Sequence, residues 1–378
     1  MNTLSLQNKK NIKHKKLQFT SIGYKKYLKG LVKIKYHRMF RNDDLLSSLA
    51  VKTWEVAPGN TSIVTKAFFL DGQLDRVTNN AVTDDPNLLM IGGNKITHAP
   101  TKAYLLKNTW MLNGNVYKGV NQLLYHPSYQ ITSKKRYFPP IKIDTEINNA
   151  AIYHTYDGFK AFGVWLSDDC TLYKLAESEG TPVTSNIFAS PHMLEYESLL
   201  GMNPVRSNAA YLKSAVFFDD NWDNNYSKHE RFASNRNKLL SKFKGSKHPG
   251  IFIIRGNSGK KRIMLNEIEI AEQLHKKYGF KVMDVNKNSV SEILSASVGA
   301  QIVIGVEGSH LMHGLMVLEP GTSVLTLQPP NRFCGVLKMT TDMENINYGF
   351  VVGTQKKEGF YVNLEEVERT IDLLPIRT

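Results

Sequence analysis

The sequence predicts an α/β protein with two Rossmann-like domains, and three observations support this. Apolar, β-branched runs alternate with helix-length segments between about residues 250 and 327, which is the pattern of a parallel sheet with helices on both faces. Residues 160–240 show a second helix–strand alternation. The 378 residues also exceed what one hydrophobic core usually organises. We therefore expect two α/β domains that face each other across a cleft.

The alternation between about residues 250 and 327 is the better defined of the two. Its expected strands are 251–254, 280–285, 302–304 and 324–327, and its expected helices are 266–278, 289–297 and a segment from 308 to Pro320-Gly321. Gly279 is placed to end the first helix as its C-cap. Ser289, with Glu292 three residues later, predicts a capping box.

The first half of the chain contains shorter elements. Expected strands are Ala67–Leu70, Lys102–Leu106, Ser185–Ala189 and Ala215–Phe218; expected helices are Trp165–Ser178, His192–Leu200 and about Lys228–Phe243; Tyr137–Pro140 is an expected loop. A linker ending at His248-Pro249-Gly250 predicts domains at 42–247 and 248–345, after a basic segment at 1–41. The remaining segment, 346–378, carries a helix at about Leu364–Leu374 that we expect to cross back to the first domain.

A strand that turns through glycine into a helix predicts an anion site. Ile302–Ile304 leads into Gly305, and the following segment opens at Gly308-Ser309, so free backbone N–H groups would point above the sheet edge. Arg255 ends a parallel strand at that same edge, where ligands of such sheets bind. The natural ligand is a phosphate or diphosphate, although similar turns also occur in proteins with no ligand there.

At these residues the chain resembles glycosyltransferase family 61. The family's R…R…NE…E element is matched by Arg255, Arg262, Asn266, Glu267 and Glu269. Its G-x-H-G-A-x-L-x-N-x-L-F-x-x-P-G element is matched by Gly305 to Pro320-Gly321. Its G-x-H-W-L-x-D element is matched by Gly163 to Asp169. Val164 and Glu307 stand where the family usually has histidine, and His313 stands where it usually has asparagine. The match covers roughly residues 150–330 and implies a GT-B-like architecture, a nucleotide-sugar donor and a role in glycan assembly.

The motifs supply the candidate site residues. Those expected to bind the donor are Arg255, Arg262, Asn266, Glu267, Gly305, Gly308, Ser309, His310 and His313. Glu307 would repel a diphosphate placed at a helix N-terminus, so it is expected to bind sugar hydroxyls or to act as the base. His310 and His313 share a helix face, where they would contact phosphate or simply be buried.

An inverting transfer needs a general base for the acceptor hydroxyl, and Asp168 and Asp169 are the further candidates. Adjacent carboxylates on an α-helix point about 100° apart, so only one can face a cleft. Asp168 is preferred because it aligns with the family's aspartate; helix capping is the alternative role for the pair. Trp165 is the acceptor-side candidate, and packing in the core is its alternative.

The sequence favours chemistry without a metal. Asp219-Asp220 follows a strand and Asp223 lies beyond, but there is no strict D-x-D to hold a divalent ion, and arginines can replace one. His310 and His313 have no third partner at zinc-ligand spacing. The alternatives are a metal-dependent GT-A-type transferase and a non-catalytic nucleotide- or glycan-binding module. The sugar and its nucleotide stay open.

Composition indicates where the protein works. Residues 1–41 carry twelve Lys or Arg and no Asp or Glu, and supply most of the formal net charge of +14. Tyr24, Tyr27, Leu28, Leu31 and Val32 recur there at helical spacing, which predicts an amphipathic helix on an anionic membrane surface; a solvated or packed segment is the alternative. No nucleic-acid-binding motif follows, so nucleic acid is not an expected partner.

The cysteines and the apolar runs fit that location. The two cysteines, Cys170 and Cys334, form no metal or disulfide framework, which favours a reducing cytoplasm. No run of about 18 apolar residues and no signal-peptide core is found. We expect an inverting glycosyltransferase of capsule or lipopolysaccharide biosynthesis on the inner face of the cell membrane.

Overall fold

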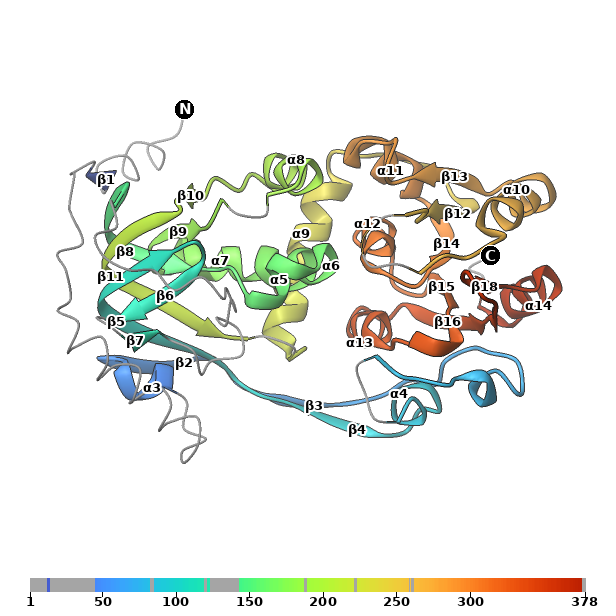
Figure 1. Cartoon of the computed structure of the whole chain (residues 1–378), viewed down its shortest axis with the longest axis horizontal. Helices are drawn as coiled ribbons and strands as arrows, with labels where there is room; N and C mark the ends of the chain where they lie inside the picture. The colour runs from blue at the N-terminus through green and yellow to red at the C-terminus, as the bar shows by residue number, and fades with distance from the viewer. Residues whose placement is uncertain are drawn as a thin grey trace. The chain divides into compact units, whose positions relative to one another are not determined.

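The chain divides into two compact units, each made of two separate stretches of sequence. The computed structural model describes residues 12–13, 45–81, 85–118, 121–122, 143–186, 189–220, 223–257, 259 and 262–375. Unit 1 comprises Met1–Gly59 and Ala99–Asp223, and unit 2 comprises Asn60–His98 and Asn224–Thr378. Both contain sheets with parallel strands and helices, so the α/β class is confirmed (Figure 1). The helix expected at Tyr24–Val32 and the loop at Tyr137–Pro140 lie outside the described residues.

Unit 1 is built on a mixed sheet. Its strands, in the order β10-β9-β8-β11-β5-β6-β7, are Val205–Arg206, Thr181–Thr184, Thr145–Ile152, Ala209–Asp219, Thr101–Leu112, Asn115–Lys118 and Asn121–Gln122; β1 (Ile12–Lys13) pairs with β8, and β2 (Lys52–Ala57) pairs with β5. The strands from β10 to β11 are parallel, whereas β5, β6 and β7 are antiparallel. Asn113 and Gly114 join β5 to β6 with φ of 48° and 76°, values that a two-residue hairpin requires. Half of this sheet therefore departs from the expected Rossmann-like pattern.

The two helices that the sequence predicts in unit 1 are present, at residues 165–179 and 191–200, together with three short helices among the described residues that it does not predict. They are α3 (Leu45–Leu49), α5 (Tyr156–Lys160), α6 (Phe162–Val164), the π-helix η3 (Trp165–Asp169), α7 (Cys170–Glu179) and α8 (Pro191–Leu200). The strand expected at Ser185–Ala189 is wrong, because β9 ends at Thr184. The side chain of Asn208 bonds the Ser185 hydroxyl and the Asn186 backbone N–H, and the chain leaves the sheet there.

Unit 2 is a doubly wound domain with a five-stranded parallel sheet. Its strands, in the order β13-β12-β14-β15-β16, are Lys281–Asp284, His248–Ile254, Ala300–Val306, Ser323–Gln328 and Asn347–Val352. Its helices are α9 (Tyr226–Leu240), α10 (Glu267–Tyr278), α11 (Val290–Ser297), α12 (Met312–Leu315), α13 (Val336–Met343) and α14 (Leu364–Leu373), with the 3-10 turns η4 (Ser309–Leu311) and η5 (Pro330–Arg332). In Figure 1, α10 and α14 cover one face of the sheet, and α12 and α13 cover the other.

The local signals in this half are confirmed. Gly279 has φ of 71° and caps α10, and Ser289 with Glu292 forms the capping box of α11. The helix expected from 308 to 320 is too long, because only η4 and α12 are helical. The N–H groups of Val317 and Leu318 bond the carbonyls three residues back, and this tighter turn ends the α-helix.

A segment from the first half of the chain completes unit 2. Residues 60–98 carry β3 (Asn60–Ile63), β4 (Lys95–His98), η1 (Leu74–Arg76) and α4 (Asn87–Met90). The Phe68 N–H donates to Tyr348 O at 2.9 Å, and Phe68 O accepts from Phe350 N–H at 3.1 Å. The strand expected at Ala67–Leu70 is thus a single bridge to Gly349 on the edge strand β16. The unit boundaries consequently differ from those expected at 42–247 and 248–345.

Two helices belong to unit 2 where the sequence suggested otherwise. The α9 side chains of His229 and Arg236 both pair with Glu344, the residue that follows α13. Helix α14 packs in the core of unit 2, since Val367 and Ile371 lie in the same core cluster as Val351 of β16. The hairpin β17 (Thr354–Gln355) and β18 (Phe360–Tyr361) lies between β16 and α14.

Candidate functional site

The candidate site in unit 2 lies where the order of the sheet reverses. Strands β12 and β14 are neighbours, although β13 comes between them in the chain and lies on the other side of β12. Arg255 follows the end of β12, and Glu307 and Gly308 follow the end of β14. In doubly wound sheets, ligands bind beyond the carboxyl ends of the strands at this switch point. The expectation that Arg255 and the Gly308 turn converge there agrees with the geometry.

Glu307 is the centre of a group of arginines. Its side chain is 5% exposed, and its Oε2 accepts from Arg262 Nη1 at 2.5 Å and lies 3.4 Å from Arg332 Nη1. Arg262 Nη1 also donates to the Glu307 backbone carbonyl at 2.6 Å. These contacts fix the positions of two guanidinium groups, which is the role the structure shows for the Glu307 carboxylate.

Gly308 makes room for the arginines. A Cβ at this position would lie 2.2 Å from Arg255 Nη1 and 3.0 Å from Arg262 Nη1, so a side chain would displace both groups. Burial, followed by the charge of Arg262, lowers the Arg255 pKa to about 10. Burial also lowers the pKa of Arg262. Both guanidinium groups stay charged at neutral pH, and a bound anion would relieve their mutual repulsion.

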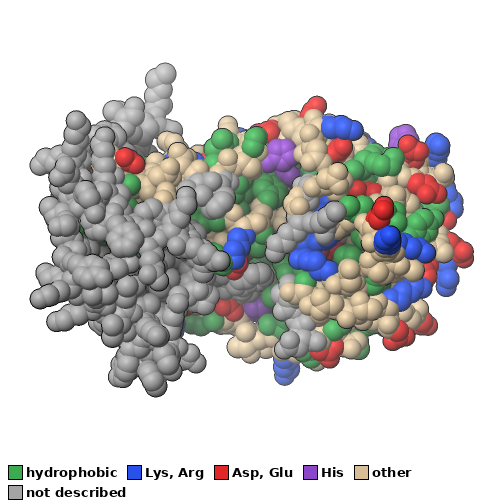
Figure 2. All heavy atoms as spheres, viewed as in Figure 1, with side chains coloured by type: hydrophobic (Ala, Val, Ile, Leu, Met, Phe, Trp, Pro, Cys, Tyr) green, Lys and Arg blue, Asp and Glu red, His purple; other side chains and the backbone are tan. Residues whose placement is uncertain are grey.

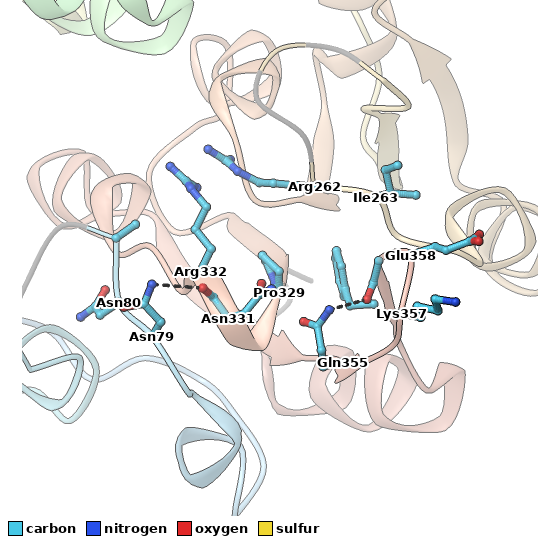
Figure 3. Close-up of a pocket in the computed structure, with 13 residues that line it drawn as sticks. Asn79, Asn80, Arg262, Ile263, Pro329, Asn331, Arg332, Gln355, Lys357 and Glu358 are labelled. Atoms are coloured by element: carbon cyan, nitrogen blue, oxygen red, sulfur yellow. Dashed lines mark hydrogen bonds between the residues drawn. The ribbon is translucent and has the colours of Figure 1, made fainter.

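A cavity of about 1000 Å³ opens beside this group. Its lining is mostly basic or amide in character and comprises Asn79, Asn80, Ala81, Arg262, Ile263, Pro329, Asn331, Arg332, Gln355, Lys357, Glu358, Gly359 and Phe360. Figure 3 shows the Arg262 and Arg332 side chains extending side by side, with Asn79 and Asn80 below them and Gln355 and Lys357 on the other side of the pocket. Figure 2 shows Lys and Arg side chains on the surface of unit 2, interspersed with acidic and uncharged side chains. The cavity suits an anion that also carries hydrogen-bonding groups.

Two of the expected donor-binding side chains are engaged in the fold. Glu267 accepts from the backbone N–H groups of Arg255 at 2.7 Å and Gly256 at 2.9 Å, and burial raises its pKa. The Asn266 amide donates to Val362 O at 2.8 Å and accepts from Val362 N–H at 3.1 Å. Both side chains therefore hold backbone in place: Glu267 fixes the turn after β12, and Asn266 fixes the chain at Val362.

Other motif residues lie beneath the arginines. At Gly305, a Cβ would lie 2.6 Å from Ile253 O and 3.3 Å from His310 Nε2, so only glycine permits this packing. Burial and the nearby Arg255 hold the His310 pKa well below its usual value, and the ring is neutral. His313 is buried on α12, and Ser309 is half-buried at the start of η4. Because the helical stretch is so short, the arginines dominate the electrostatics here, and the helix N-terminus adds little.

The unit 1 candidates lie on the π-helix η3 and the helical turns beside it. Asp169 is fully buried; its Oδ1 accepts from the Thr155 N–H at 3.0 Å, and a Cβ on Gly158 would lie 2.2 Å from its Oδ2. Asp169 therefore supports the N-cap residue of α5, and its side chain makes no capping hydrogen bond to its own helix, so the expected capping role is not found for Asp169. Asp168 is 7% exposed and accepts from the Ser167 hydroxyl at 2.6 Å. Wide π turns are frequent at functional sites, which keeps Asp168 as the candidate base.

Trp165 packs in the core. It is 4% exposed, and its ring lies 5.9 Å from Phe162 and 6.4 Å from Tyr196 between centroids. The packing alternative stated for this residue fits, whereas a sugar platform would need an exposed ring face.

Sequence reasoning did not single out Arg332, Lys357, Gln355 or Asn79. Arg332 follows β15 at the same sheet edge as Arg255. The rule that ligands bind beyond the carboxyl ends of parallel strands could therefore have identified it. The others reach the cavity through the 60–98 segment and the β17–β18 hairpin, for which no local motif exists.

The side chains of Cys170 and Cys334 are both buried, and neither forms a disulfide within the described residues. Among the described helices, none is long and apolar enough to span a membrane. Within the described ranges, no three His, Cys, Asp or Glu side chains gather as metal ligands would.

Comparison with protein families accounts for this arrangement. The family model for glycosyltransferase 61 matches residues 109–325, which is more than half of the chain. The matched range runs from β5 to β15 and contains Asp168, Arg255, Arg262 and Glu307. A search of curated proteins gives no match. With the family's arginine and glycine elements meeting at one sheet edge, the chain belongs to the glycosyltransferase 61 family and is a glycosyltransferase.

Proposed function

We propose that this enzyme is an inverting, metal-independent glycosyltransferase that moves a sugar from a nucleotide-sugar donor to a glycan acceptor. The observation that carries the proposal is the group formed by Arg255, Arg262 and Arg332 around Glu307, at the side of a cavity of about 1000 Å³. The pathway we propose is the biosynthesis of a surface polysaccharide, such as capsule or lipopolysaccharide.

The donor's charge and its hydrogen-bonding groups have separate partners in unit 2. Guanidinium groups bind phosphate oxygens through pairs of N–H donors, which suits the phosphate part of the donor. The cavity volume lies at the upper end of the range for small-molecule sites, and the amides of Asn79, Asn331 and Gln355 line it. A nucleoside would occupy this amide-lined part of the cavity.

The arginines support departure of the nucleotide without a metal. As the sugar–phosphate bond breaks, negative charge grows on the leaving phosphate oxygen, and fixed positive groups stabilise that charge. Three arginines and one carboxylate leave the group with two net positive charges, which is the amount that a diphosphate requires. The Glu307 carboxylate keeps Arg262 and Arg332 in place for this task.

Asp168 is the base that we propose. The acceptor hydroxyl oxygen attacks the anomeric carbon from the face opposite the phosphate, its proton passes to the Asp168 carboxylate, and the nucleotide leaves with the bonding electrons. One displacement inverts the configuration. Glu307 is a weaker candidate because it is ion-paired with arginine, and Asp169 because it bonds the Thr155 backbone. A GT-B-like arrangement of the two units is part of this proposal.

The decisive experiment measures binding and turnover of a panel of UDP- and CMP-linked sugars with full-length protein in EDTA. We expect one donor to bind and to release free nucleotide when an acceptor is present. Arg332→Ala should weaken binding of that donor, whereas Arg369→Ala, a control on an exposed face of α14, should not. Binding without turnover would instead support a non-catalytic nucleotide-binding module. Activity that requires a divalent ion would contradict the metal-independent mechanism.

We also propose that the enzyme is cytoplasmic and binds the inner face of the cell membrane. The support is the sequence of residues 1–41, with twelve basic and no acidic side chains. Lysines near an anionic surface each contribute about 1 kcal/mol to binding.

A further inference from the structure

Unit 2 contains a second cavity, of about 290 Å³, that shares no residue with the arginine-lined one. It lies between β3 and β4, the start of α9 and α13, and the apolar side chains of Val64, Leu89, Met339 and Met343 form part of its lining. Its volume is at the lower limit of small-molecule sites, about 300 Å³, so it suits a ligand the size of one sugar ring.

The charged groups at this cavity are paired with one another. Lys338 is fully buried and contacts Asp342, a lining residue, with 2.5 Å between its Nζ and Oδ2. His229 Nδ1 lies 2.9 Å from Glu344 Oε1, and Arg236 Nη2 lies 2.7 Å from Glu344 Oε2. These pairs leave little attraction for an anion, and the wall favours an uncharged ligand.

The remaining polar groups supply both donors and acceptors. Asn60 Oδ1 accepts from the Tyr226 backbone N–H at 3.1 Å, and Asn224 Nδ2 donates to Met339 O at 3.4 Å, which fixes both amides and leaves Asn60 Nδ2 and Asn224 Oδ1 for a ligand. Asn345 lines the cavity, and its side chain is exposed. His229 uses Nδ1 for Glu344, so Nε2 is its remaining ring nitrogen.

An aromatic ring completes the cavity. Tyr226, the first residue of α9, lines the cavity together with Asn60 and Asn224 and is 68% exposed, so its ring is accessible to a ligand. A purely apolar ligand would leave the amides without hydrogen bonds, at a cost of about 1–3 kcal/mol for each buried group. A hydroxyl-rich ring with C–H groups on its faces satisfies both the amides and the aromatic ring.

We propose that this cavity is a second carbohydrate-binding site that holds one neutral sugar residue of a glycan. The site goes beyond the proposed donor site because its residues, charge and volume are all separate from those of the arginine group. A glycan held there would increase the local concentration of its own reacting end, as expected for two linked binding events.

Saturation-transfer NMR with full-length protein tests the proposal. The probes are methyl glycosides of glucose, galactose, mannose and N-acetylglucosamine, at millimolar concentration and without nucleotide. We expect at least one glycoside to bind. The double variant Tyr226→Ala/Asn345→Gly should bind that glycoside with an affinity at least tenfold lower. Glycine suits position 345 because Asn345 has φ of 54°. The matched control is Tyr361→Ala, which removes a 42% exposed tyrosine that lines neither cavity.

Two further measurements separate this site from the donor site. Nucleotide-sugar binding should be the same in the double variant as in the wild type, and the KM for a long glycan acceptor should rise while kcat stays constant. The proposal is overturned if no glycoside binds the wild type, if the double variant binds as well as the control, or if inorganic phosphate displaces the glycoside. None of these outcomes depends on whether the arginine group binds the donor.

Discussion

Glu307 explains how three arginines can lie close together at one sheet edge. Its carboxylate lies between Arg262 and Arg332, and the neighbouring Gly308 admits Arg255. Where the family usually has histidine, this chain has a negative charge that offsets part of the repulsion. Losing a buried partner of this kind is costly because it leaves an uncompensated charge.

The first prediction concerns Arg255. We expect Arg255→Ala to weaken nucleotide-sugar binding by about 1.5–3 kcal/mol, the usual range for a hydrogen bond to a charged group. Isothermal titration calorimetry measures the change, with Arg369→Ala as the surface control. An unchanged dissociation constant in a variant with native circular dichroism would remove Arg255 from the donor site.

The second prediction concerns the base. Asp168→Asn should leave donor affinity nearly unchanged and slow transfer by about 100-fold or more, because an amide cannot take the acceptor proton. Single-turnover kinetics separates the two effects. If Asp168→Asn turns over normally while Asp169→Asn or Glu307→Gln does not, the base is that other residue.

Among the connections between elements, the turn from β14 to η4 controls the arginines. A Cβ at Gly308 would lie 2.2 Å from Arg255 Nη1, so Gly308→Ala should displace this guanidinium and lower donor affinity about tenfold, as a loss of about 1.4 kcal/mol implies. Fluorescence titration with the nucleotide-sugar that binds the wild type measures the dissociation constant of each variant. Gly93→Ala is the control, since a Cβ there meets no atom within 4 Å. Equal affinity in both variants would show that the arginines tolerate the extra methyl group.

The segment after β8 predicts a loss of stability in acid. His154 is buried, its Nε2 lies 3.0 Å from Gly114 O, and burial lowers its pKa to about 4. The unfolded chain has a pKa near 6.5, so it binds the proton first as pH falls. The contribution of neutral His154 to the free energy of unfolding is fully present above about pH 6.5. It decreases as the pH falls toward 4, by about 3 kcal/mol over the full range.

Urea unfolding at pH 7.0 and pH 4.5 tests this, with His154→Gln as the variant that cannot titrate. We expect the stability difference between the two pH values to be smaller in the variant. A pH dependence identical to the wild type would mean that other groups cause the acid sensitivity.

The elements of unit 2 between β12 and β15 were largely predictable because their signals are local. Gly279 and the Ser289 capping box mark helix ends within a few residues, and the apolar runs mark buried parallel strands. The roles of Asn266 and Glu267 were not predictable, since their partners are backbone groups at Val362, Arg255 and Gly256. A motif gives the position of a side chain in the chain, and the fold decides whether it meets a ligand or backbone.

For the molecule as a whole, the basic segment at 1–41 predicts membrane binding. Full-length protein should sediment with anionic vesicles at low salt. Added salt should release it from the vesicles, because the Debye length falls to about 8 Å at physiological ionic strength and the lysines are then screened. A variant lacking residues 1–41 should stay in solution and still transfer sugar to a small soluble acceptor. If full-length protein does not sediment with anionic vesicles at low salt, the proposed membrane binding is contradicted.

The division into units was the least predictable feature. Composition and linker signals suggested one boundary between the two α/β domains, near His248, whereas the chain passes between the units after Gly59, after His98 and after Asp223. Residues 60–98 belong to unit 2 through contacts such as the pairing of Arg76 with Glu366 and of Thr78 with Pro330. Contacts over 250 residues of sequence leave no mark in any local pattern.

This discontinuity has a consequence for synthesis on the ribosome. Residues 60–98 are made first, yet their partner Gly349 on β16 is made some 250 residues later. At about 5–20 residues per second, the early segment waits on the order of tens of seconds before its docking surface exists. During that interval its apolar residues, among them Phe68 and Met90, have no native neighbours from the sheet. Production of this protein should therefore respond to translation speed and to chaperones that hold nascent chains, and a fragment starting at Asn224 lacks part of its own domain.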